Sequence, residues 1–78
     1  MSSSASLRSL RAVLARNIRH AREQRDWSQE YLAERSGLTQ VFVSRLETAK
    51  AAATVDTLEK LARAFGEPAY SLLQPLSD

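Results

Sequence analysis

Apolar residues recur every three or four positions along the first third of the chain. This stripe consists of Leu7, Leu10, Leu14, Ile18 and Ala21. The spacing places these side chains on one face of an α-helix, and the pattern stops near Arg25. It therefore predicts a helix over residues 7–25. The polar, serine-rich residues 1–6 are expected to form a flexible tail.

The next apolar pattern is interrupted once, at Gly37, and resumes one residue later. Ser28 offers a side-chain oxygen as the N-cap of a helix whose inward residues are Leu32 and Ala33. Gly37 ends this helix, because glycine adopts the left-handed backbone conformation at little steric cost. The pattern predicts a short helix over residues 29–36.

A second short helix follows Thr39, which can serve as its N-cap. Its inward side chains are Phe42, Val43 and Leu46. Two helices of about eight residues, joined by a short turn with a single glycine, are the form of a helix-turn-helix. The interruption at Gly37 is therefore predicted to be the turn of such a unit.

A fourth helix is predicted between Thr54, a candidate N-cap, and Gly66, a candidate C-terminal stop. Its apolar face consists of Val55, Leu58, Leu61, Ala62 and Phe65. Residues 48–53 before it are predicted to form a loop, and an extension of the preceding helix is the alternative.

A final short helix is predicted to open at Pro68, which suits a first helical residue, and to stop at Pro75. Its apolar residues are Tyr70, Leu72 and Leu73. The chain has only two glycines and two prolines, too few for the many turns of an all-β fold. The sequence thus predicts an all-α fold of five helices.

Length and composition exclude several classes of protein. A chain of 78 residues can bury only one core, so residues 7–76 are predicted to form a single domain. There is no cysteine, and His20 is the only histidine, so no metal or cofactor is expected. No Ser-His-acid set is visible, which disfavours an enzyme. Without an apolar run of roughly 20 residues or a signal region, we expect a cytoplasmic protein and no membrane partner.

The net charge of +2 is unevenly distributed. Residues 1–25 hold six arginines against one glutamate, whereas residues 26–78 hold five basic and eight acidic residues. On the first predicted helix, a basic edge is formed by Arg8, Arg11, Arg19 and Arg22. Such polarised charge favours a polyanionic partner on one face of the molecule.

The spacing within residues 29–46 identifies a family. Ala33 is small where the two helices cross, Gly37 makes the turn, and the helices are locked together by Leu32, Leu38, Val43 and Leu46. With the segments "RNIRHAREQRDWSQEYLAERSGLTQVFVSRLE" and "VDTLEKLARAFG", the chain resembles the Cro/CI-type, lambda-repressor-like (XRE) helix-turn-helix family of prokaryotic and phage transcription regulators. This resemblance implies a compact five-helix domain that binds operator DNA as a homodimer.

The resemblance also implies roles for single residues. Reading of bases in the major groove is implied for Gln40, Val41, Ser44 and Arg45. Contacts to DNA phosphates are implied for Gln29, Thr39, Thr48, Lys50 and Arg19. Gln can recognise adenine, Arg can recognise guanine, and a small apolar group can meet the thymine methyl. Arg22 and Glu47 match an Arg and a Glu that form a buried salt bridge in the family.

The chain departs from the family in "ETAKAAAT", where Ala49 replaces a glycine, and this leaves the path of the loop against DNA open. A two-fold interface is predicted from the apolar residues near the C-terminus, some of which must close the core: Tyr70, Leu72, Leu73 and Leu76. The alternative function is that of an antitoxin, or another member of the same fold, which acts by binding a toxin or other protein partner.

Overall fold

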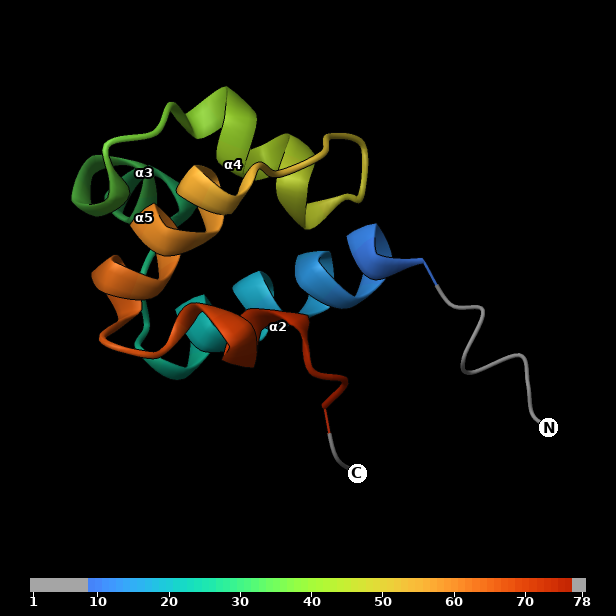
Figure 1. Ribbon diagram of the computed structural model, residues 1–78. Helices are drawn as coiled ribbons and strands as arrows, with labels where there is room; N and C mark the ends of the chain where they lie inside the picture. The colour runs from blue at the N-terminus through green and yellow to red at the C-terminus, as the bar shows by residue number, and fades with distance from the viewer. Residues whose placement is uncertain (1–8, 77–78) are drawn as a thin grey trace, which may run out of the picture.

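Four α-helices and a terminal 3-10 helix make up residues 9–76, the part of the chain that the computed structural model describes. The elements are α2 (Leu10–Gln24), α3 (Gln29–Ser36), α4 (Gln40–Glu47), α5 (Val55–Phe65) and the 3-10 helix η1 (Ala69–Leu73) (Figure 1). Residues 9–76 contain no strand, so the predicted all-α class is confirmed. The predicted tail, residues 1–6, and Leu7 lie outside the described residues.

The N-caps predicted for α3, α4 and α5 are confirmed. Ser28, Thr39 and Thr54 each accept a hydrogen bond from the N–H group three residues further on. Ser9, which the apolar pattern did not reveal, caps α2 by accepting a bond from the Arg11 N–H group. Local chemistry therefore sets the start of every α-helix.

Each α-helix is followed, within two residues, by a residue in the left-handed backbone conformation. Gly37 and Gly66 end α3 and α5 with φ of 77° and 73°, as predicted. Asp26 after α2 and Ala49 after α4 adopt the same left-handed conformation, with φ of 57° and 61°. These two residues are not glycine, so each holds a conformation that a side chain disfavours.

Residues 48–53 form a loop between α4 and α5. The Lys50 N–H group donates to the Arg45 carbonyl over 2.8 Å, and this bond closes the end of α4. The loop prediction is therefore confirmed, and the alternative of a longer helix is wrong.

The core lies where α3, α4 and α5 meet α2 and η1. In Figure 1, η1 lies alongside α2, and α3, α4 and α5 lie together on one side of these two elements. The largest fully buried side chains are Ile18, Leu32, Val43, Leu46, Leu61 and Leu72. Every element contributes at least one of them, so the helix-turn-helix of α3 and α4 rests on the whole domain. None of the helices in residues 9–76 combines the length and apolar character that crossing a bilayer requires.

Three expectations about burial are wrong. Leu10 and Val55 were expected to face the core, but both are exposed, because each is the first residue of its helix and extends beyond the packed turns. Leu72 was assigned to a dimer interface, but only 1% of it is exposed, and it belongs to the core.

The last element also differs from the prediction. Pro68 precedes the helix in an extended conformation, with φ of −68° and ψ of 145°, and is not its first helical residue. The five residues after it form a 3-10 helix without a side-chain cap. 3-10 helices are usually short, because their hydrogen-bond geometry is poorer than that of an α-helix.

Candidate nucleic-acid interface

Helix α4 has two chemically distinct faces. Val43 and Leu46 are fully buried against the other helices. On the opposite side Gln40 is exposed, 71% of Val41 is exposed, and Ser44 is half-buried. The structure thus brings three of the four predicted base-reading residues together on one outward face of a helix that is anchored by its other face.

The N-terminal end of α4 offers hydrogen-bond donors to solvent. The Thr39 hydroxyl oxygen accepts from the Phe42 N–H group over 3.1 Å, so its own proton remains available. Within residues 9–76, the N–H groups of Gln40 and Val41 make no hydrogen bond. The positive end of the helix dipole adds to these donors, and the arrangement suits a phosphate.

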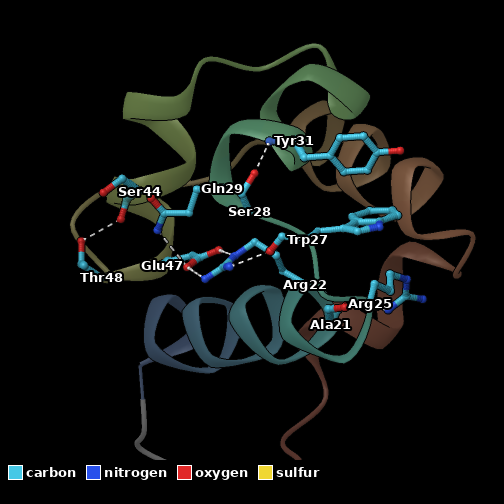
Figure 2. Close-up of polar contacts among 10 residues, drawn as sticks. All are labelled: Ala21, Arg22, Arg25, Trp27, Ser28, Gln29, Tyr31, Ser44, Glu47 and Thr48. Carbon is cyan, nitrogen blue, oxygen red and sulfur yellow. Dashed lines mark hydrogen bonds and ion pairs between the residues drawn. The ribbon is translucent and has the colours of Figure 1, made fainter.

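A buried ion pair joins α2 to the C-terminal end of α4. The Arg22 guanidinium donates from Nε to Glu47 Oε2 over 2.7 Å and from Nη2 to Glu47 Oε1 over 2.9 Å (Figure 2). Arg22 Nη1 also donates to the Trp27 carbonyl over 2.9 Å. The hydrogen bond to Glu47 raises the pKa of Arg22 above its usual value, although burial acts in the opposite direction. Arg22 is therefore positively charged throughout the neutral pH range.

Gln29, a predicted phosphate contact, takes part in the same network. Its Nε2 donates to Glu47 Oε1 over 3.0 Å, so α3 is tied to the pair that joins α2 and α4 (Figure 2). One amide hydrogen of Nε2 is used in this bond and the second remains for a further acceptor. Gln29 thus has an internal role in the structure, in addition to the DNA contact predicted from the sequence.

The C-terminal end of α4 is closed by two of the predicted site residues. Thr48 Oγ1 donates to the carbonyl oxygens of Ser44 and Arg45, at 3.1 and 3.2 Å. Arg45 Nη2 donates to the Lys50 carbonyl over 3.0 Å. Because a hydroxyl has a single proton, Thr48 must release these carbonyls before it can donate to a phosphate.

A groove of about 490 Å³ lies between α2, the end of α4 and the C-terminal segment. Arg16 and Arg19 line it from α2, and Thr48 and Ala49 line it from the other side. The structure therefore places the predicted phosphate contact Arg19 beside the loop that begins at Thr48. Lys60 is an exposed residue of α5 and does not line this groove.

The profile of the helix-turn-helix family matches residues 18–72. The chain belongs to this family. It is 46% identical over 66 residues to a hypothetical transcription factor of Neisseria meningitidis serogroup B, a match that covers 85% of this chain and 62% of that protein. The chain thus spans less than two thirds of this relative.

Solved structures share the fold. The crystal structure of the hypothetical transcription factor NHTF from Neisseria has a TM-score of 0.83 at 45% identity, covering 86% of this chain and 77% of that one. The restriction-modification controller protein C.AhdI from Aeromonas hydrophila has a TM-score of 0.77 at 27% identity, covering 80% and 94%. The predicted resemblance to helix-turn-helix regulators of the Cro/CI type is therefore confirmed.

The residues predicted to form a dimer interface separate into two groups in this helix-turn-helix domain. Tyr70 is 67% exposed, and Leu73 and Leu76 are half-buried. Leu72, fully buried, cannot contact a second subunit. An apolar surface therefore remains around η1 and the C-terminal segment, with Tyr70 as its most exposed member.

Asn17 is a buried residue of the helix-turn-helix domain that the sequence interpretation missed. Its Nδ2 donates to the carbonyl oxygens of Leu72 and Gln74, both at 2.7 Å, so α2 holds η1 and the C-terminal segment in place. The signal was present in the chain: Asn17 lies three residues after Leu14 and four before Ala21, on the buried face of α2. A polar residue at such a position requires buried partners.

Arg25 was also missed. Its Nη1 donates to the Ala21 carbonyl over 2.8 Å and its Nη2 to the Phe65 carbonyl over 2.9 Å, and Nη2 also pairs with Glu67 over 3.1 Å. Trp27 lies stacked on Phe65, with ring centroids 5.7 Å apart. This cluster joins the end of α2 to the end of α5, away from the exposed face of α4, and we assign it to stability.

Proposed function

We propose that this chain regulates transcription by binding double-stranded DNA sequence-specifically, with α4 in the major groove. The observation that carries the proposal is the division of α4 into a buried face, Val43 and Leu46, and an outward face, Gln40 and Val41. An α-helix fits the major groove of B-form DNA, and the outward residues of its N-terminal half usually reach the base edges.

Each outward side chain has a matching base edge. The Gln40 amide can bond both N6 and N7 of adenine, and the Val41 side chain can meet the methyl group of thymine. The Ser44 hydroxyl can bond either a donor or an acceptor on a base. Arg45 differs from these residues, because its guanidinium already has a partner in the Lys50 carbonyl.

Phosphate contacts from both sides would fix α4 in the groove. Thr39 and the free N–H groups at the start of α4 supply donors at one end, and Lys50 supplies a charge at the other. Arg19 on α2 and Gln29 at the start of α3 extend the contact to neighbouring phosphates. These contacts position the protein and carry no sequence information themselves.

The proposal includes a homodimer on a two-fold operator. An apolar surface that a second copy of this small domain could cover is formed by Tyr70, Leu73 and Leu76. Two-fold symmetry would set the two α4 helices about 34 Å apart, which is one turn of DNA.

Selection of bound sequences from a random duplex library tests the proposal directly. The expected result is a two-fold symmetric consensus with half-sites whose centres are about 10 base pairs apart. Enrichment of no sequence above the library background would contradict sequence-specific binding. A strong enrichment of one unpaired half-site would contradict the dimer and leave base reading intact.

A further inference from the structure

Arg45 is bonded to Lys50 at two points. The Arg45 carbonyl accepts from the Lys50 N–H group over 2.8 Å, and the Arg45 guanidinium donates from Nη2 to the Lys50 carbonyl over 3.0 Å. Between them lies Ala49, in a left-handed conformation that is rarely adopted without glycine. The turn after α4 is thus closed by the main chain and, in addition, by a side chain of the helix itself.

The loop beyond this turn carries donors without partners. Within the described part of the chain, the N–H groups of Ala51, Ala52 and Ala53 make no hydrogen bond. Ala51 and Ala53 pack against the core, and Lys50 before them is exposed. Two kinds of contact therefore fix the path of the loop. Ala51 and Ala53 pack against the core, and the Arg45 guanidinium holds the Lys50 carbonyl.

The place of Arg45 on the helix also argues against base reading. Gln40 and Val41 are in the first turn of α4, whereas Arg45 is in its last turn. Recognition helices of this kind contact base edges mainly with N-terminal residues. The single bond from Nη2 to the Lys50 carbonyl also directs the Arg45 side chain toward the loop that follows the helix.

We propose that Arg45 is a positioning residue. It fixes the loop of residues 49–53 in the free protein, so that Lys50 and the loop N–H groups are already ordered when they meet a DNA phosphate. A loop that is held in its bound path loses less conformational entropy on binding than a flexible one. The inference rests on the proposed function and replaces base reading as the role of Arg45.

The first test measures the loop without DNA. Backbone ¹⁵N relaxation of the full chain is compared for the wild type, Arg45→Ala and the matched control Lys50→Ala, which removes the same charge and keeps the guanidinium bond. The amides of residues 50–53 are expected to gain motion in Arg45→Ala alone, with those of Leu46 and Phe65 unchanged. Equal relaxation in all three proteins would overturn the inference.

The second test measures affinity for the selected operator and for an unrelated duplex. Arg45→Ala is expected to weaken both by a similar factor of about ten, as for loss of a phosphate contact. A loss confined to the operator would show that Arg45 reads a base, and the inference would be wrong.

The two tests separate this inference from the proposed function. A wild-type protein that binds neither duplex would contradict the proposed function and, with it, the role of the loop at DNA. The relaxation data would then still establish whether the Arg45 guanidinium orders the loop.

Discussion

The Arg22 guanidinium holds the Glu47 carboxylate by two hydrogen bonds, of 2.7 and 2.9 Å, at a position where only 3% of the Glu47 side chain is exposed. We predict that Glu47→Ala lowers the free energy of unfolding by about 3 to 5 kcal/mol, since it leaves the Arg22 side chain, which is only 14% exposed, without its counter-charge and Gln29 without its acceptor. Urea denaturation followed by circular dichroism measures this loss.

A double variant distinguishes the effect of an unpaired charge from the effect of lost side-chain volume. Arg22→Met combined with Glu47→Leu removes both charges and is expected to be more stable than either single substitution. The comparison pair is Arg25 with Glu67, which is far more exposed, so Glu67→Ala should cost less than about 1 kcal/mol. Equal losses at the two glutamates would contradict the buried role of Glu47.

Ala49 holds a left-handed conformation, with φ of 61°, at the end of α4. Ala49→Gly is predicted to raise the free energy of unfolding by about 1 kcal/mol, because glycine adopts this conformation without a steric penalty. The matched control is Gly37→Ala, at φ of 77° with no atom within 4 Å of the added Cβ, and should cost a similar amount. Thermal unfolding of both variants decides, and a less stable Ala49→Gly protein would refute the argument.

The contrast between these two positions shows what local sequence can predict. The ends of α3 and the start of α4 were predictable because Ser28, Gly37 and Thr39 carry chemistry that suits caps and stops in any helix. Ala49 gives no such signal, because alanine favours continued helix. Its conformation is set by contacts of its neighbours, namely the two bonds between Arg45 and Lys50 and the packing of Ala51 and Ala53 against the core.

The same distinction applies to the candidate site. The outward face of α4 was predictable, because the spacing of buried Val43 and Leu46 fixes which residues lie opposite them. The bonds from Gln29 to Glu47 and from Arg45 to Lys50 depend on side-chain conformations that helix periodicity does not specify. The burial of Leu72 likewise follows from how η1 packs against α2, which the spacing of its apolar residues alone does not determine.

Asn17 provides a test of the buried hydrogen bonds that hold the C-terminal segment. Its Nδ2 faces two carbonyl oxygens, so Asn17→Asp would place a carboxylate oxygen against them without changing the shape of the side chain. At pH 7 this variant should be less stable than Asn17→Ala, which leaves acceptors unpaired at a cost of about 1 to 3 kcal/mol.

The defect of Asn17→Asp should depend on pH. Burial beside carbonyl oxygens raises the pKa of the new carboxyl above its usual value near 4. A group whose pKa is raised on folding favours the folded state most at low pH and loses that contribution as pH rises through the raised value. Unfolding measured against pH should therefore show the variant recovering toward pH 4 relative to Asn17→Ala. A difference between the two that is constant with pH would contradict this.

Base reading and phosphate contact predict different effects of two substitutions near α4. Gln40→Ala should lose about 1 to 3 kcal/mol of binding on the selected operator and little on unrelated DNA. Lys50→Ala should weaken binding to both, and should lower the slope of log affinity against log salt by about one. Fluorescence anisotropy titrations over a range of salt concentrations measure both. A Gln40→Ala protein that loses equally on every duplex would assign Gln40 to the backbone.

Tyr70 is 67% exposed beside the half-buried Leu73, and this surface is where the proposed dimer would form. Tyr70→Glu places a charge in the interface, and burying it would require desolvation without a partner. We expect this variant to sediment as a monomer at concentrations where the wild type is a dimer, with the fold unchanged because Tyr70 is outside the core. Leu10→Glu, at a similarly exposed apolar residue of α2, is the control and should leave the dimer intact.

On DNA, insertion of roughly five base pairs between the half-sites turns them to opposite sides of the duplex. This insertion should weaken DNA binding by the wild type but not by Tyr70→Glu. If the insertion weakens both proteins equally, the two half-sites are not bridged through Tyr70, and the interface lies elsewhere.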